Sequence, residues 1–163
     1  MSCPFNLAIN GQTRMLADLS LVGCYNRSFI NSKDRDIILL ESAKQNLKKM
    51  AFFGICEMQK ISQYLFESTF KLHFLHPFIQ LNETHSSLLF NELSQSDFDQ
   101  IKALNHLDIQ LYQFARQLLI KRFEKLKKLD NHFERNFIKL NAQFESFNLK
   151  NSNYIQDIFP EIR

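Results

Sequence analysis

The chain has 163 residues, enough for one domain with a modest hydrophobic core. It contains 17 Phe, three Gly, three Pro and no Trp, a composition that favours long helices and argues against a β-sandwich or barrel. The net charge is only +3, no apolar stretch approaches the roughly 20 residues of a membrane span, and the three cysteines lack the spacing of a zinc site. We therefore expect no metal.

Two helices are predicted in the first 50 residues. Residues 12–21 have the spacing of a short amphipathic helix, with Met15, Leu16 and Leu19 on one face. Residues 34–50 repeat apolar side chains at helical spacing, with acids in the first turn and lysines in the last, as the helix dipole prefers. The apolar face of this second helix comprises Ile37, Leu40, Ala43, Leu47 and Met50.

The next segment predicts an α/β layer. Residues 51–55 form an apolar run without helical polarity, which indicates a buried strand, and residues 57–70 return to helical spacing. A second short strand is an option around residues 72–75. Helix, buried strand and helix in succession are typical of an α/β protein and not of a bundle. The polar stretch PFIQLNETHSS, residues 77–87, then ends the apolar run as a loop.

The remainder of the chain predicts one long helix. Residues 96–99 resemble a helix N-cap, and residues 98–148 contain neither Gly nor Pro. Apolar residues recur every three or four positions, and Arg122 interrupts this seam, which predicts a break between a packed and a projecting segment. The expected divisions are 1–97 as the folded domain, 98–150 as a long amphipathic helix that is coiled-coil-like from about residue 123, and 151–163 as an unpatterned tail.

Positive charge is concentrated in this last third. Between Arg116 and Lys150 there are nine Lys or Arg against four acidic residues. Two interpretations stay open, a solvated surface or a face for an anionic partner. Nucleic acid is the weaker choice of partner, because no aromatic stacking platform or nucleic-acid motif accompanies the charge.

The histidines are the residues best suited to acid–base chemistry. We interpret His73 and His76 as core or loop groups, and His106 and His132 as exposed positions on the long helix. Only His85 falls in a polar loop beside an apolar wall, which suits contact with a ligand. No Ser–His–Asp order, H-E-x-x-H, Walker loop or G-x-G-x-x-G is present, so the residue pattern by itself names no reaction.

Four blocks of sequence resemble a known family. They are CPFNLAINGQTRMLADLSLVGCYN at residues 3–26, LLESAKQNLKKMAFFGICEMQKISQYLFESTF at 39–70, PFIQLNETHS at 77–86 and ALNHLDIQLYQFARQLL at 103–119. In wording, order and separation they look like the C-terminal half of the heparan-sulfate 6-O-sulfotransferases. The resemblance covers roughly residues 3–125.

The resemblance implies a fold and a reaction. It implies the C-terminal portion of a P-loop-like α/β sulfotransferase fold, in a single-pass type II Golgi membrane protein with a lumenal catalytic domain. Such enzymes move a sulfo group from 3′-phosphoadenylyl sulfate to the 6-hydroxyl of glucosamine in heparan sulfate. The family's phosphosulfate loop, catalytic histidine and 3′-phosphate ligands match nothing here. We therefore expect no catalytic residue in this chain, no transfer by the chain alone, and membrane attachment only through an N-terminal anchor absent from it.

By resemblance, one wall of the cosubstrate pocket is present. The positions that match cosubstrate contacts of the family are Ile79, Gln80, Leu81, His85 and Ser86. Leu81 stands where the family has Tyr, His85 where it has Arg, and Ser86 where it has Ala. Exchanging an Arg for a His replaces a permanent bidentate cation by a group that is mostly neutral near pH 7, which predicts weaker nucleotide binding.

The resemblance also implies modifications typical of a secretory protein. The sequons at Asn26 and Asn82 coincide with family sequons and are predicted glycan acceptors. Cys3 and Cys24 match family cysteines, and an oxidising lumen would allow them to form disulfides, with partners that the sequence leaves open. The alternative to an enzyme portion is a non-catalytic helical scaffold that binds a glycan or a protein partner. The long apolar seam would allow self-association in either case.

Overall fold

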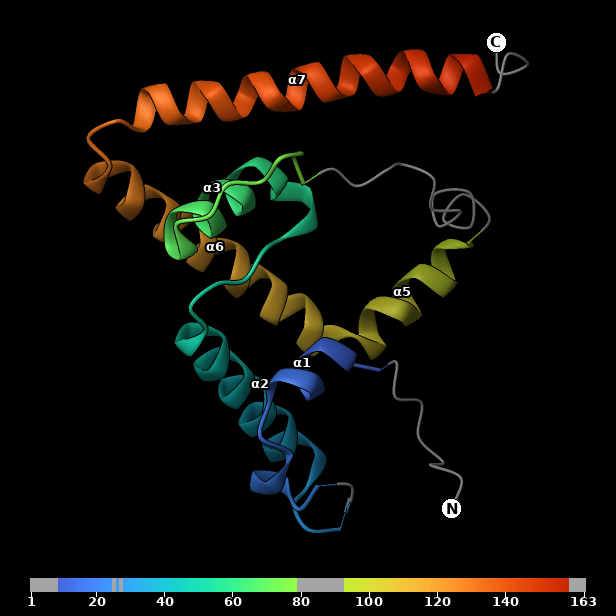
Figure 1. Ribbon diagram of the computed structural model, residues 1–163. Helices are drawn as coiled ribbons and strands as arrows, with labels where there is room; N and C mark the ends of the chain where they lie inside the picture. Colours follow the sequence, from blue (N-terminus) through green and yellow to red (C-terminus); the bar gives the residue numbers. More distant parts are fainter. Residues whose placement is uncertain (1–8, 25, 27, 79–92, 159–163) are drawn as a thin grey trace. The chain divides into compact units, whose positions relative to one another are not determined.

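The computed structural model describes residues 9–24, 26, 28–78 and 93–158, with backbone alone over 147–158 (Figure 1). None of the described residues forms a β-strand. Within the same ranges, no helix is long and apolar enough to span a bilayer. With η marking 3₁₀ helices, the elements run in the order α1 (Gly11–Leu16), η1 (Leu19–Val22), α2 (Ser32–Lys49), η2 (Cys56–Met58), α3 (Gln59–Phe70), α5 (Gln95–Leu104), α6 (His106–Leu129) and α7 (Phe133–Ile158).

The chain folds as two compact units. The first contains α1, η1, α2, α5 and α6 as far as Leu118, and the second contains η2, α3, α7 and α6 from Leu119 onward. Buried apolar side chains of the first unit are Val22, Leu39, Leu40, Ala43, Leu47, Leu107 and Leu111. Those of the second unit are Ile55, Tyr64, Leu65, Leu119, Phe123, Leu140 and Phe144.

The predicted helix at 34–50 is confirmed as α2, which begins two residues earlier. Asn31 is its N-cap, and the side chain of Asn31 accepts a hydrogen bond of 3.0 Å from the N–H of Asp34. The apolar face is rotated from the predicted one, since Leu39 is buried whereas Ile37 is 55% exposed. Both residues fit the helical period, so only the neighbouring elements decide which is covered.

The predicted helix at 12–21 is divided into α1 and η1. Asp18 separates them, because its carboxylate accepts hydrogen bonds from the N–H of Ser20 at 3.0 Å and the hydroxyl of Ser20 at 2.6 Å. A short polar side chain that bonds its own backbone competes with helix continuation in this way. The predicted apolar face is wrong at Met15, whose side chain is 81% exposed.

The predicted strand at 51–55 does not form. The segment is extended, but side-chain atoms of α3 take the place of a partner strand: Ile55 N–H donates to the hydroxyl of Ser62 at 3.0 Å. The ring of Phe52 packs edge-on against Phe66, with ring centres 5.1 Å apart. The optional strand at 72–75 is likewise a loop. This apolar run, flanked by helices in the chain, is therefore a loop that packs against α3.

The single helix predicted over 98–150 is also wrong, because the structure places three helices in this stretch. Asn105 interrupts the first with φ −111° and ψ 27°. A second interruption lies at 130–132, where the carboxylate of Asp130 accepts a 2.8 Å hydrogen bond from the N–H of His132. The break predicted at Arg122 is absent, and the guanidinium carbon of Arg122 lies 5.1 Å from the ring centre of Phe53.

The helix ends also differ from the expected ones. The N-cap of α5 is Ser94 and not a residue of 96–99. The hydroxyl of Ser94 accepts from Asp97 N–H at 3.2 Å, and the Asp97 carboxylate accepts from Ser94 N–H at 3.3 Å, which completes a capping box. Helix α7 continues to Ile158, so most of the predicted tail at 151–163 is helical. The predicted domain boundary at residue 97 stays a prediction.

Candidate functional site

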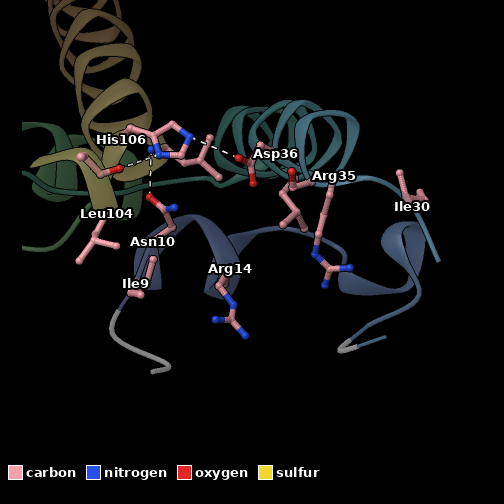
Figure 2. A pocket seen from close by; sticks show the side chains of 12 residues that line it. Ile9, Asn10, Arg14, Ile30, Arg35, Asp36, Leu104 and His106 are labelled. Atoms are coloured by element: carbon pink, nitrogen blue, oxygen red, sulfur yellow. Dashed lines mark hydrogen bonds and ion pairs between the residues drawn. The ribbon is translucent and has the colours of Figure 1, made fainter. Parts of the chain in front are cut away.

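A pocket of about 340 Å³ lies in the first unit, at the junction of α1, α2, α5 and α6 (Figure 2). Polar and apolar side chains contribute equally to its lining. The polar lining residues are Asn10, Arg14, Ser32, Arg35, Asp36 and His106, and the apolar ones are Ile9, Ile30, Leu39, Ala103, Leu104 and Leu107.

Reciprocal capping of two helices builds one wall of this pocket. The side-chain oxygen of Asn10, in front of α1, accepts hydrogen bonds from Leu107 N–H at 2.9 Å and Asp108 N–H at 3.3 Å, in the first turn of α6. In return, the Asp108 carboxylate accepts from Gln12 N–H at 3.0 Å and from Thr13 N–H at 2.7 Å. Each helix start thus satisfies the orphan N–H groups of the other.

His106 and Asp36 close the pocket between α6 and α2. In Figure 2 the imidazole points toward Asp36, and Nε2 lies 3.4 Å from its carboxylate. Nδ1 lies 3.1 Å from the carbonyl oxygen of Ala103, to which it can donate in the tautomer that carries the proton on Nδ1. The imidazole thus lies between the Ala103 carbonyl on one side and the Asp36 carboxylate on the other.

Two guanidinium groups give the pocket an excess of positive charge. Arg35 donates to the carbonyls of Val22 at 2.8 Å, Asn26 at 3.3 Å and Cys24, which are dipoles without net charge. Arg14 is the second cation, and Asp36 is the one carboxylate among the lining residues. Both guanidinium groups point away from His106 in Figure 2. A pocket with this balance suits an anionic group.

Glycine is required where the chain turns beneath Arg35. Gly23 ends η1 with φ 69°, in the left-handed region that side chains disfavour. A Cβ built there would lie 2.6 Å from the ring of Phe29, which leaves no room for it. The turn brings the carbonyls around it toward α2, where the Arg35 guanidinium binds them.

In the second unit, a buried amide anchors the segment that leads toward the predicted cosubstrate wall. Gln63 of α3 is fully buried; its side-chain oxygen accepts from Phe78 N–H at 2.7 Å, and its nitrogen donates to Glu67 at 2.8 Å. Glu67 also accepts from Phe74 N–H at 3.1 Å. The rings of Phe74 and Phe78 lie 4.3 Å apart and both contact Phe66. Phe78 is thus held by a polar anchor and an aromatic cluster.

The five predicted cosubstrate residues lie outside the described residues. They are Ile79, Gln80, Leu81, His85 and Ser86, and the predicted glycan acceptor Asn82 lies outside as well. Their roles stay predictions. Phe78, the residue immediately before them, is described by the structure.

The other predicted sites lie on the surface. Asn26 is exposed, and its side-chain oxygen accepts from Ser28 N–H at 3.1 Å and from the Ser28 hydroxyl at 2.8 Å. Cys24 and Cys56 are exposed free thiols, whereas Cys3 lies outside the described residues. Within those residues, no cluster of three His, Cys, Asp or Glu side chains could hold a metal ion.

Sequence reasoning missed one histidine of the pocket. His73 and His76, predicted to be core or loop groups, are exposed loop groups, and His132 is exposed as expected. His106 is also largely exposed, yet it lines the pocket and contacts Asp36, a residue 70 positions earlier in the chain. No local pattern marks such a pair, because it depends on where α2 and α6 meet.

A tyrosine–carboxylate pair joins α3 to the start of α7 in the second unit. The hydroxyl of Tyr64 donates to Asp130, which also accepts from the Asn136 side chain at 3.0 Å. The bond from Tyr64, then those from His132 N–H and Asn136, hold the pKa of Asp130 below its usual value of 3.8. Burial first, and then Asp130, raise the pKa of Tyr64.

These shifts predict a pH dependence of stability. Because the folded-state pKa of Asp130 is depressed, its contribution is present above about pH 4 and is lost as the pH falls through the folded-state pKa. Asp130→Asn is expected to lower the free energy of unfolding at neutral pH, by a difference that vanishes in strong acid, where both side chains are neutral. Urea denaturation across this pH range measures it. Glu134→Gln, an exposed neighbour, is the control, and an equal loss at every pH would contradict the assignment.

Comparison with known proteins identifies the family. Residues 1–115 match the sequence profile described as the sulfotransferase family. Since this match covers well over half of the 163 residues, the chain belongs to the sulfotransferase family.

Within the sulfotransferase family, the most similar relatives are heparan-sulfate 6-O-sulfotransferases. The chain is 50% identical over 135 residues to human heparan-sulfate 6-O-sulfotransferase 3, covering 83% of this chain and 28% of the relative. It is 57% identical over 116 residues to heparan-sulfate 6-O-sulfotransferase 1-A of Danio rerio, covering 71% of this chain and 28% of the relative. For heparan-sulfate 6-O-sulfotransferase 2 of Gallus gallus the identity is 48% over 131 residues, with coverages of 80% and 32%. The chain thus spans about a third or less of the length of these curated relatives.

Proposed function

We propose that this chain supplies the C-terminal part of a heparan-sulfate 6-O-sulfotransferase. The observation that carries the proposal is the identity of about half of all residues over 135 positions with proteins of that name. In the proposed reaction the 6-hydroxyl oxygen of a glucosamine unit attacks the sulfur of 3′-phosphoadenylyl sulfate. The bond from sulfur to the phosphate oxygen breaks, adenosine 3′,5′-bisphosphate leaves, and a base takes the hydroxyl proton. Such an in-line transfer depends on positioning and on fixed positive groups.

Within this reaction the chain would contribute binding surfaces and not the base. Ile79, Gln80, Leu81, His85 and Ser86 are the proposed cosubstrate wall. The polar anchor formed by Gln63 and the rings beside Phe78 support this proposal, because they fix the residue that leads into the wall. The surrounding fold would be the P-loop-like α/β fold of sulfotransferases, to which the described helices contribute one part.

The proposed setting is the Golgi lumen, in a type II membrane protein. The exposed Asn26 sequon supports it, because a glycan acceptor must be accessible. Asn82 would be the second acceptor. The pocket of the first unit, with its excess of positive charge, suits a carboxylate or sulfate of the polymer.

A chimera tests the proposed function. This chain replaces the matching segment of human heparan-sulfate 6-O-sulfotransferase 3, and sulfo transfer from 3′-phosphoadenylyl sulfate to 6-O-desulfated heparin is measured. We expect transfer at the 6-position by the chimera and none by the 163-residue chain alone, which contains no Walker-type loop. A chimera that melts cooperatively but transfers only at background would contradict the proposal and favour the non-catalytic scaffold.

The same chimera tests the cosubstrate wall. His85→Arg restores a permanent cation, so the KM for 3′-phosphoadenylyl sulfate is expected to fall roughly tenfold, as for one added charge-assisted hydrogen bond. His132→Arg adds the same charge at an exposed position of the second unit and serves as the control. Equal effects of the two substitutions would show that residue 85 does not contact the cosubstrate.

A further inference from the structure

The C-terminal part of α6 presents three lysines in line, which we name the lysine row: Lys121, Lys125 and Lys128. Their spacing of four and three residues places them within about 60° around the helix axis and about 10 Å along it. All three are exposed. Leu119 and Phe123, on the opposite side of the helix, are buried in the second unit. The row therefore lies at the centre of the exposed face of α6.

The charge of the row is not cancelled by its surroundings. Residues 119–129 contain five basic side chains and one acidic one, Glu124. Within the described residues, ion pairs within 4 Å such as Lys44–Glu41, His73–Glu67 and His106–Asp36 do not involve the row. The other two basic residues of the segment contact rings, Arg122 that of Phe53 and Lys127 that of Phe133. The three lysines are thus exposed and make no ion pair within 4 Å, with Glu124 as the one acidic residue of the segment.

We propose that the lysine row is a binding surface for the sulfated glycan chain, additional to the transfer site. The identity of the glycan rests on the proposed function; the surface itself rests on the charge and the geometry of α6. A heparan-type polymer carries sulfate and carboxylate groups at regular intervals along an extended chain. A line of flexible ammonium groups complements such a ligand without fixing a single register, and it would hold the polymer while individual units are modified.

The composition of the exposed face of α6 argues against nucleic acid as the ligand of the lysine row. Proteins that bind single strands interleave positive charge with exposed aromatic rings on which bases stack. The aromatic residue of this segment is Phe123, and it is buried on the other side of the helix. Among residues 119–129, the exposed positions are Lys, Glu, Ile and Leu. The surface thus offers charge alone, which suits a polyanion without stacking bases.

Heparin binding by the full chain tests the proposal. A size-defined heparin octasaccharide is titrated against the natural chain and against the triple variant Lys121→Gln, Lys125→Gln, Lys128→Gln. We expect binding at least about tenfold weaker in the variant, and a slope of log affinity against log salt that is smaller by about 2 to 3, as for three lost ion contacts. Glu124→Gln, which removes the adjacent negative charge, is expected to strengthen binding severalfold.

A matched control variant shows whether heparin binding depends on the lysine row itself or only on the net charge of the chain. Lys33, Lys49 and Lys60 are exposed lysines outside the row, and their triple change to Gln removes the same charge. We expect this control to retain most of the affinity and of the salt slope. Equal losses in the two triple variants, or tighter binding of a single-stranded oligonucleotide of equal charge than of the octasaccharide, would overturn the proposal.

The heparin titration and the chimera assay test the two proposals independently of each other. Row-dependent heparin binding together with an inactive chimera would leave the glycan surface in place and remove the proposed transferase role. An active chimera whose chain binds heparin independently of the row would remove only the surface.

Discussion

Asp108→Ala is expected to lower the free energy of unfolding by about 2–4 kcal/mol, because it removes three hydrogen bonds at once and leaves buried donors without partners. Its carboxylate accepts from Gln12 N–H, from Thr13 N–H and from the Thr13 hydroxyl, the last two at 2.7 Å. Thr13 is completely buried, so water cannot replace the lost acceptor. The start of α1 would lose its cap, and the wall of the charged pocket would loosen with it.

Urea denaturation followed by circular dichroism measures this loss, and hydrogen exchange localises it. The amides of residues 12 and 13 are expected to exchange faster in the variant than those of α3, which lies in the other unit. Asp99→Ala is the control, because the exposed Asp99 accepts, within the described part of the chain, from the exposed Gln95 side chain on its own helix alone. This change should alter stability by less than about 0.5 kcal/mol. Equal costs for the two aspartates would refute the reciprocal cap.

Tyr64→Ala is expected to cost about 3–5 kcal/mol, as large-to-small substitutions of buried aromatic residues do. The ring of Tyr64 lies 6.0 Å from that of Phe123, 5.4 Å from Phe133 and 5.6 Å from Phe137, all close to perpendicular. It therefore joins α3 to both α6 and α7 within the second unit. Without it, the ring cluster loses its centre and Asp130 loses its hydroxyl donor.

Tyr64→Phe separates packing from hydrogen bonding. It retains the ring and removes only the hydroxyl, so a cost of about 0.5–1.5 kcal/mol is expected. Thermal unfolding followed in the near ultraviolet, where the aromatic cluster contributes, gives both values. If Tyr64→Phe were as damaging as Tyr64→Ala, the bond to Asp130 and not the ring packing would hold the second unit together.

Local pattern was sufficient for the two helices with the clearest period. In α2, acids near the start, lysines at the end and apolar residues at helical spacing agree with one another, and the helix forms as predicted. Helix α3 also lies within the predicted segment, from Gln59 to Phe70. These signals act between residues close in the chain, which is why the sequence suffices for them.

Where the predictions failed, a distant partner competed with the local pattern. Residues 51–55 have the composition of a buried strand. However, the hydroxyl of Ser62 forms the hydrogen bonds to the N–H and carbonyl of Ile55 that a partner strand would make, and the ring of Phe52 packs against Phe66 of α3. The long stretch without Gly or Pro has no local reason to bend, yet Asn105 ends α5 while its side chain accepts from Asn10 N–H, 95 residues earlier. Hydrogen bonds between residues so far apart in the chain cannot be predicted from the spacing of apolar residues.

The sequence by itself determined the class of this protein: its ordered blocks resemble heparan-sulfate 6-O-sulfotransferases, and residues 1–115 match the sulfotransferase family. Composition and spacing also determined that the chain is mainly helical and that its last third is basic. Only the tertiary structure decided which groups meet. It placed His106 beside Asp36, capped α1 with Asp108, and left the lysine row exposed on α6. The physical reason is that helical period depends on neighbours three and four residues apart, whereas a site depends on side chains that the folded chain brings together from positions 70 to 100 residues apart.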